Sequence, residues 1–512
     1  MDPGTQTLSS NPWMTACICE ALLTIWLIYA YRDRAFGSSS NTGIPGPKGV
    51  PVLGNLRQLL PYKEDFMGWL STNEAIYGPL FTYTVPGFGR SVVIDRPEWL
   101  EHVKKKDMIA YGKGKRTLAI FREFFGSFSQ ASTEGDAWKA NRRITTSLVS
   151  IKTFDKQVAR AMGEVIPTAI ELLTSIASSE SVMDWNIFAG RLSLEMLFRV
   201  AFSADAKSLS ADPSCLETKN EILDALHTCG KITMSRFANP GSPLVEKING
   251  THERFRSARA KLWTVADRIA DERLHLREEG LSNEDDYLTV LLASQLGRQL
   301  TRETLVAILF AGQDNNVNLL GWSLYELTRS PSWIQRMRDE AESKGVDGRI
   351  IDWNSVSSYP VHLAVLYETL RLWPGVPKNS RCAMEDDILP GIPSLGYGPV
   401  KISKGDYVVW SDHLMMRRTD VWGEDAQVFN PGRHLDAEGK FVKPQQPKFH
   451  AFGAGPRACS GSQLATYEFV QVWAALLPLF DIEPVEMKER EMADGLTSTM
   501  AGDFLVRVKL RK

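Results

Sequence analysis

The chain has 512 residues, of which 43% are hydrophobic and 23% charged, a composition typical of a globular protein with a large core. Its formal net charge of -2 lacks the strong positive excess expected of a nucleic-acid-binding protein. The 6 cysteines are scattered and include no CxxC pair, which favours a reducing compartment over a disulfide framework and indicates no zinc site.

The first predicted element is an apolar segment, residues 13–31, that we expect to span a membrane. It has nearly the length of about 20 residues that crosses a bilayer, and Glu20 is its only charged residue. Arg32 and Arg34 follow directly, so the positive-inside rule places residues 1–12 in the lumen and the rest of the chain in the cytosol. A buried core helix and a cleaved signal peptide are the alternatives, although the signal peptide would need a basic start.

Residues 32–60 are interpreted as a linker that is first polar and then rich in proline. Pro45, Pro47 and Pro51 cannot continue a helix and favour stiff, extended backbone. Such a segment would fix the orientation of a domain next to a membrane, although an ordinary flexible linker has the same composition. Residues 61–512 contain no internal repeat and no low-complexity break, so we expect one mainly helical domain with a minor β-sheet.

Within this domain a few elements are predicted by pattern. The longest is a helix that begins at Thr301 as N-cap and ends before Pro331. Residues 203–250 are rich in Gly, Pro, Ser and Asn, and they predict long loops. Three short alternating segments predict strands: residues 80–85, 89–94 and 406–411.

The sequence HAFGAGPRACSGSQLA, residues 450–465, places one cysteine at the centre of a glycine-rich loop. A thiolate is a strong metal ligand, and a single one can hold haem iron from one side. Glycines allow backbone N–H groups to point at the sulfur of Cys459 and allow a flat ring to approach closely. A helix that starts after the loop favours a thiolate, and Arg457 suits a haem propionate. An inert cysteine in a turn is the alternative.

The loop resembles the haem-binding loop of the cytochrome P450 family. Phe452, Gly455, Arg457, Cys459 and Gly461 together match the pattern F-x-x-G-x-R-x-C-x-G. The resemblance implies the cytochrome P450 fold, mainly α with a minor β-sheet, preceded here by a single N-terminal transmembrane helix. It also implies haem b as cofactor, bound by these five residues, with Cys459 as the axial thiolate and metal ligand.

A second family motif, E-x-x-R, is found at Glu368 and Arg371 in YETLRLWP. Residues three apart share a helix face, so the two side chains can pair. The resemblance implies that Arg433, in VFNPGRHLD, joins them in a buried structural network without a catalytic role. Glu253 and Arg256 have the same spacing, but no helix-ending segment follows them, and we interpret them as a solvated surface pair.

Two further segments match family positions that reach a haem propionate. Trp138 and Arg142 lie one helical turn apart in GDAWKANRRITTSL, and Arg381 lies in PKNSRCA. The resemblance implies that these residues bind the cofactor together with Arg457. An amphipathic helix with a basic face is the alternative for the first segment.

The long predicted helix carries AGQDNN, residues 311–316, where the family usually has A-G-x-D/E-T-T/S. The resemblance implies that Ala311 and Gly312 leave room for dioxygen and that Asp314 helps to relay protons. Asn315 stands where the family usually has threonine, and an amide does not relay protons as a hydroxyl does. We count all four among the catalytic residues, although a surface aspartate is the alternative for Asp314.

The resemblance implies a monooxygenase that inserts one atom of dioxygen into a hydrophobic lipid-like or secondary-metabolite substrate, by hydroxylation or epoxidation. Residues 389–431 look most like the fungal and plant branch that hydroxylates alkanes and fatty acids, and a role in fungal secondary metabolism is expected. NADPH–cytochrome P450 reductase is the expected electron donor, with cytochrome b5 as an optional second partner. Residues 61–512 would form the haem-thiolate catalytic domain.

The expected location is the endoplasmic reticulum membrane, with a single pass and a cytosolic catalytic domain. The sequence NGT at residues 249–251 is a glycosylation sequon that should then remain unmodified. Two other functions stay open. Asn315 supports an isomerase or dehydratase that acts on an oxygenated lipid without dioxygen or NADPH, and the haem loop alone would also serve a non-enzymatic sensor.

Overall fold

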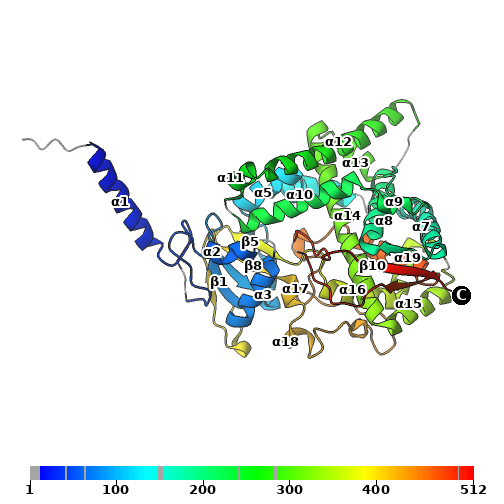
Figure 1. Ribbon diagram of the computed structural model, residues 1–512. Helices are drawn as coiled ribbons and strands as arrows, with labels where there is room; N and C mark the ends of the chain where they lie inside the picture. The colour runs from blue at the N-terminus through cyan, green and yellow to red at the C-terminus, as the bar shows by residue number, and fades with distance from the viewer. Residues whose placement is uncertain are drawn as a thin grey trace, which may run out of the picture.

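A computed structural model describes residues 12–40, 43–62, 65–147, 154–239, 241–281, 286–346, 348–493 and 495–511. Residues 1–11, most of the predicted lumenal segment, lie outside this range. Helix α1 (Pro12–Ala30) projects from the rest of the protein (Figure 1). In the described part of the chain, Trp13–Ala30 is the one stretch long and apolar enough to cross a membrane, with a mean hydropathy of 1.6 and no part buried against protein.

The proline-rich half of the predicted linker is packed on the first strand of the sheet. The N–H of Thr82 donates to the carbonyl of Pro45 at 2.8 Å, and the N–H of Asn55 donates to the carbonyl of Thr84 at 2.8 Å. A Cβ on Gly46 would lie 2.0 Å from the Thr82 carbonyl oxygen, so only glycine allows this approach. This segment is therefore part of the folded domain and is not a free linker.

The main sheet has the strand order β1-β2-β8-β5-β3. Strands β2 and β8 are parallel, and the other neighbours are antiparallel. The three predicted strands are β1, β2 and β8. Every residue of β1 and β2 is buried, including the polar residues Thr82, Thr84, Arg90 and Ser91. The bounds are β1 (Leu80–Thr84), β2 (Arg90–Ile94), β3 (Tyr111–Gly112), β5 (Asn379–Ala383) and β8 (Tyr407–Trp410).

The central helix is α14 (Arg298–Arg329), which packs along α8 (Trp185–Phe202). It begins three residues before the predicted Thr301, because Gly297 with φ of 78° turns the chain into the helix. The prediction of long loops over residues 203–250 was wrong for most of that stretch. Pro243 lies in the first turn of α11 (Ser242–Ile248), where the N–H that proline lacks would have no partner within the helix. Asn220 is the N-cap of α10 (Glu221–Ala238).

Around this centre the helices form two groups, as Figure 1 shows. The group above the sheet contains α5 (Lys115–Phe125), α10 (Glu221–Ala238), α11 (Ser242–Ile248), α12 (Thr251–Glu278) and α13 (Tyr287–Ala293). The other contains α7 (Phe154–Ser178), α9 (Ser214–Glu217), α15 (Pro331–Ser343), α16 (Pro360–Leu372) and α19 (Ser462–Leu476). A large apolar core joins α7, α8, α14, α16 and α19.

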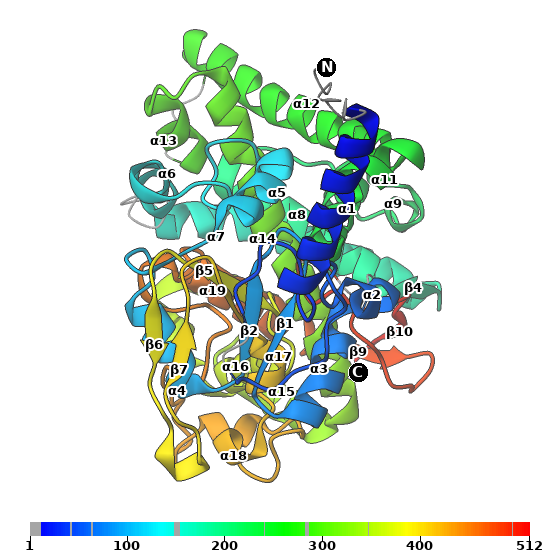
Figure 2. The same ribbon diagram turned by 90° about the vertical axis from the view of Figure 1, so that its left-hand side faces the viewer.

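Two smaller sheets flank the body on opposite sides (Figure 2). One pairs β6 (Asp387–Leu389) with β7 (Val400–Ile402), and the other has the order β4-β10-β9, formed by β4 (Val182–Asp184), β9 (Phe480–Pro484) and β10 (Leu505–Leu510). The last strand of the chain is thus held between two earlier ones. The other short helices are α2 (Leu56–Leu59), α3 (Phe66–Tyr77), α4 (Pro97–Lys105), α6 (Gly135–Ser147), α17 (Asp412–Met415) and α18 (Thr419–Trp422). The 3-10 turns are η1 (Leu60–Tyr62), η3 (Trp353–Ser358), η4 (Pro393–Leu395), η5 (Pro431–His434) and η6 (Gly455–Arg457).

Candidate functional site

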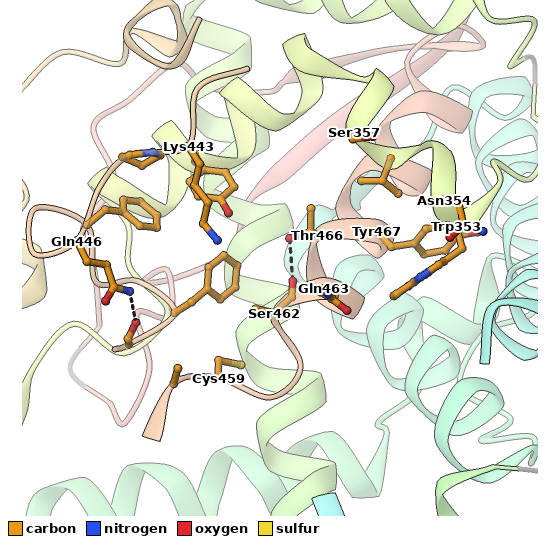
Figure 3. A pocket seen from close by; sticks show the side chains of 17 residues that line it. Trp353, Asn354, Ser357, Lys443, Gln446, Cys459, Ser462, Gln463, Thr466 and Tyr467 are labelled. Carbon is orange, nitrogen blue, oxygen red and sulfur yellow. Dashed lines mark hydrogen bonds between the residues drawn. The ribbon is translucent and has the colours of Figure 1, made fainter. Parts of the chain in front are cut away.

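The glycine-rich loop turns back on itself directly before α19. The N–H of Cys459 donates to the carbonyl of Phe452 at 2.8 Å. Gly453 and Gly455 have φ values of 70° and 66°, in the left-handed region that residues with a side chain rarely adopt. This turn leaves the cysteine side chain accessible at the edge of a cavity, as Figure 3 shows.

The charge state of this thiol is set by opposing effects. Burial by the surrounding loop raises the pKa of Cys459, while the N–H of Gly461 and the positive charge of Arg142 lower it. A Cβ on Gly461 would lie 4.0 Å from the sulfur, so the backbone at the start of α19 is close to the thiol. The two stabilising groups favour the thiolate, which is the form that coordinates a metal.

Helix α14 is tied to α19 by a buried contact between two polar side chains. The Nδ2 of Asn316 donates to a carboxylate oxygen of Glu468 at 2.5 Å. Burial raises the pKa of Glu468 and the hydrogen bond from Asn316 offsets part of this effect, so that the resulting pKa is about 8. Because Cys459 lies just before α19, this contact brings the AGQDNN segment of α14 to the cysteine loop.

The two small residues of AGQDNN, Ala311 and Gly312, have different surroundings. Ala311 is exposed, although Phe310 and Gln313 beside it are buried. A Cβ on Gly312 would lie 2.7 Å from the Cδ1 of Leu197 on α8. The missing side chain of Gly312 therefore lets α14 pack closely on α8, which differs from the predicted role of leaving room for dioxygen.

Asp314 contacts a residue that is distant in sequence. The Oγ1 of Thr497, in the segment between β9 and β10, donates a short hydrogen bond to its carboxylate. Burial raises the pKa of Asp314, while Thr497 and the charge of His227 lower it. Asn315 instead donates its Nδ2 to the carbonyl of Ala311, one turn back on the same helix, at 3.1 Å.

Arg381 and Arg457 share one carboxylate. Both Nε atoms donate to Asp107, at 3.0 Å to Oδ2 from Arg381 and 3.0 Å to Oδ1 from Arg457. Arg457 also pairs with Glu134, and its guanidinium carbon lies 5.0 Å from the centre of the Trp138 ring. The structure thus brings together three of the predicted cofactor-binding residues, which come from β5, η6 and α6.

This cluster carries more positive than negative charge. Burial and the nearby arginines together lower the pKa of Lys104 to about 8 and that of Lys113 to about 7. Arg142, on the same helix as Trp138, donates its Nη2 to the carbonyl of Ala458 at 2.6 Å. The Nη1 of Arg457 is buried and has no hydrogen-bond partner among the described residues. A buried donor of this kind indicates that an anionic group belongs here.

The E-x-x-R pair lies below the loop in a network of four side chains. Glu368 accepts hydrogen bonds from Arg371, from Arg433 at 3.0 Å and from His434 at 3.0 Å. His434 also takes part, although only Glu368, Arg371 and Arg433 were predicted to form this network. None of these hydrogen bonds involves Asp314, which agrees with a structural role for the four residues.

A cavity of about 440 Å³ opens beside the cysteine loop (Figure 3). Its walls include Trp353, Lys443, Gln446, Cys459 and Tyr467. Among the described residues, none from α14 lines it. The cavity therefore lies outside the space between the loop and AGQDNN, and it is not the place where Asp314 would act.

Sequence reasoning missed three polar residues of this site. Asp107 follows three lysines, Glu134 precedes α6, and Thr497 is 183 residues from its partner Asp314. A carboxylate within a basic run was a usable signal for Asp107. No local pattern could have paired Thr497 with α14, since the contact depends on how the chain returns after β9.

The site combines an accessible thiol, a basic cluster and a helix that carries a half-buried acid, which together define a haem-thiolate enzyme. A sequence model of the cytochrome P450 family matches residues 44–506. The chain is 30% identical to "Cytochrome P450 monooxygenase cyp1" of Mycosarcoma maydis, over 98% of this chain and 81% of that protein. It is 27% identical to "Cytochrome P450 94B1" of Arabidopsis thaliana, over 95% of each, and 26% identical to "Cytochrome P450 94A2" of Vicia sativa, over 92% of this chain and 93% of that protein.

The chain therefore belongs to the cytochrome P450 family and is a monooxygenase, an oxidoreductase. The cofactor of the family is haem, whose iron takes a cysteine thiolate as ligand. The residues of this chain fit that group. They supply one accessible thiol, Cys459, and a basic cluster whose unpaired donor on Arg457 suits a carboxylate such as a haem propionate.

Proposed function

We propose that this protein is a membrane-anchored monooxygenase that hydroxylates or epoxidises a hydrophobic small molecule, with a long-chain lipid as the first candidate. The observation that carries this proposal is Asp314, which is retained, half-buried and held by Thr497 on the helix that is tied to the cysteine loop. Oxygen activation consumes protons, and a positioned acid can supply them.

The cofactor roles follow from the same contacts. Cys459 would supply the thiolate, and Phe452, Gly455 and Gly461 would shape the loop around it. When bound, thiolate-ligated haem favours cleavage of the O–O bond of dioxygen. The residues that would hold the propionates are those of the basic cluster and the ring beside it, namely Arg142, Arg381, Arg457 and Trp138.

An apolar substrate is supported by the side chains near Asp314. Ile308, one turn and a half before it on α14, and Leu496, next to Thr497, are partly exposed. Phe121 on α5 is also partly exposed and packs on the same apolar cluster. Partly exposed apolar side chains of this kind bind hydrocarbon by burial of apolar area and not by ion pairing.

Electrons would come from NADPH through a separate reductase, and cytochrome b5 is a second candidate donor. Helix α1 would anchor the protein in the endoplasmic reticulum membrane, because it is long and mostly apolar, with Glu20 as its one charged residue, and none of it is buried against protein. Arg32 and Arg34 follow it and favour a cytosolic catalytic domain.

A second function is favoured by one observation. Asn315 offers no hydroxyl, and its amide is bound to its own helix. An isomerase or dehydratase that acts on an oxygenated lipid would need neither dioxygen nor NADPH, so the loss of that hydroxyl would not affect it.

Turnover in oxygen-18 gas separates the two functions. The full-length protein is incubated with NADPH, a reductase and a panel of fatty acids and terpenoids, and products are read by mass spectrometry. Labelled product that requires NADPH is the expected result. Unlabelled product formed from hydroperoxides in the absence of NADPH would overturn the monooxygenase proposal in favour of the second function.

A further inference from the structure

The segment that carries Thr497 is fixed against α14 by its backbone. The N–H of Ser498 donates to the carbonyl of Gly375 at 3.1 Å, and the Nε1 of Trp322 donates to the carbonyl of Ser498 at 2.6 Å. The N–H of Ala493 donates to the carbonyl of Thr499 at 2.8 Å. These bonds hold Thr497 from both sides, and its exposed fraction is 3%. The position of its hydroxyl is therefore defined by the fold.

Two hydroxyl groups form a line that ends at Asp314. The Oγ1 of Thr497 donates to the carboxylate, and the Oγ1 of Thr499 lies 3.4 Å from the Oγ1 of Thr497. Thr499 is half-buried, whereas Thr497 is buried. A hydroxyl can donate one hydrogen bond and accept two, so Thr497 can take a proton from one side and give one to the other. The line leads from the half-buried Thr499 through Thr497 to the acid.

Asn315 cannot do the same. Its Nδ2 is bound to the carbonyl of Ala311 at 3.1 Å, and its Oδ1 faces Gly375, where an added Cβ would lie 2.5 Å away. An amide neither gains nor loses a proton near neutral pH. The residue next to Asp314 on α14 is thus excluded as a relay, while a hydroxyl from another part of the chain contacts that acid directly.

We propose that Thr497 reprotonates Asp314 during turnover and replaces the hydroxyl that is missing at Asn315. When Asp314 gives its proton to a water molecule on the side of Ala311, the O–H bond of Thr497 breaks and a new O–H bond forms on the carboxylate. Thr499 then restores the proton of Thr497 and takes one from water. Only protons move, so no oxidant or reductant is needed. The inference rests on the proposed monooxygenase function and assigns Thr497 as a residue that acts through Asp314.

The first test compares Thr497→Val with Thr497→Ser in the full-length, haem-loaded protein. Valine keeps the shape and removes the hydroxyl, whereas serine keeps the hydroxyl. We expect Thr497→Val to lower the product formed per NADPH by about 10-fold or more, since general acid catalysis contributes about 10²–10⁴-fold, and to release the missing electrons as hydrogen peroxide. Thr497→Ser should restore most of the coupling.

The second readout is one that a structural role would not change. In D2O the wild-type rate should show a solvent isotope effect that Thr497→Val alters and Thr497→Ser retains. Infrared difference spectra should also show that the carboxyl band of Asp314 shifts in Thr497→Val, even without turnover. The reduced carbon-monoxide spectrum confirms in each variant that the haem and its thiolate are intact.

His227 provides the competing route, because it is the other polar group that influences Asp314. Loss of coupling in His227→Gln, together with wild-type coupling in Thr497→Val, would overturn the inference and assign the relay to His227. If the wild-type protein shows no NADPH-dependent incorporation of oxygen-18, the proposed function itself fails. Incorporation by the wild type with unchanged coupling and isotope effect in Thr497→Val would reject only the role of Thr497.

Discussion

Glu368 and Arg371 lie one turn apart on α16 and form a fully buried ion pair with two parallel hydrogen bonds, each 2.8 Å long. Arg371 also donates to the carbonyls of Met416 and Ala426, both at 2.7 Å. The guanidinium therefore fixes the long segment that precedes the cysteine loop. Because this segment contains almost no regular structure, the pair replaces the backbone bonding that a helix or sheet would provide.

Removal of one partner of this ion pair should strongly destabilise the fold. Glu368→Ala leaves Arg371 buried without its anion, whereas Arg433 keeps Asp425 at 2.9 Å. We expect the unfolding free energy to fall by about 3–5 kcal/mol, measured as a drop in melting temperature and in haem content. Glu253→Ala is the control, because Glu253 and Arg256 are 3.8 Å apart and exposed. It should change stability by less than about 0.5 kcal/mol. Equal effects of the two changes would contradict the assignment.

The same pair predicts an acid dependence. Burial raises the pKa of Glu368, but the hydrogen bonds of Arg371 and His434 outweigh it and lower the pKa from 4.5 to about 2. The ion pair thus stabilises the fold above pH 4.5, by about 3 kcal/mol, and this stabilisation is lost as the pH falls toward 2. The melting temperature of Glu368→Gln should approach that of the wild type between pH 5 and 3. A constant gap would show that the carboxylate keeps no lowered pKa.

Glu468 should show the opposite dependence of folding stability on pH. Its pKa is raised to about 8, so the folded protein holds a proton that the unfolded chain releases above its ordinary value of 4.5. Stability contributed by this group therefore falls as the pH rises from 4.5 to about 8. Glu468→Gln keeps an acceptor for Asn316 and should be more stable than the wild type at pH 7, by about 3 kcal/mol. Melting curves at pH 5 and pH 7 should show the gap opening, and a variant that is less stable at both would refute the prediction.

The basic cluster predicts how firmly haem is held. Arg457→Gln removes the buried donor that has no partner among the described residues, and haem affinity should fall by about 10–100-fold. Transfer of haem to apomyoglobin measures the change. Lys139→Gln is the matched control, since Lys139 is an exposed cation on α6. If both variants lose haem at the wild-type rate, Arg457 does not bind the cofactor.

The topology can be checked without assaying activity. Asn249 is exposed at the end of α11 and lies in an NGT sequon. In a cytosolic domain it should carry no glycan, and treatment with a glycosidase should leave the mobility of the expressed protein unchanged. A sequon introduced before α1 should be modified. A glycan on Asn249 would reverse the proposed orientation.

Some of this site could be predicted from local sequence because short-range geometry fixes it. The E-x-x-R spacing places Glu368 beside Arg371 on any helix. The three short segments that form β1, β2 and β8 were recognisable as strands from their local pattern. The glycines around Cys459 also have a local reason, the left-handed turn before α19. Such features need no knowledge of where distant parts of the chain lie.

Other features depend on tertiary packing and could not be read from local pattern. Gly312 looked like a residue that leaves space for a ligand, but its neighbour is Leu197, which is more than a hundred residues away. Residues 203–250 have the composition of a loop, yet their Gly and Pro mark the borders between short helices. The partner of Asp314 comes from the far end of the sequence for the same reason.

The position of Thr497 and β10 affects the biosynthesis of the protein. Chains fold as they are made, from the N-terminus onward, at about 5–20 residues per second. The pairing of β10 with β4 and the contact of Thr497 with Asp314 both need the last part of the chain. A chain still attached to the ribosome therefore cannot complete either one. A premature stop anywhere between Cys459 and Thr497 would yield a protein that contains the haem loop but lacks the residue that holds its acid.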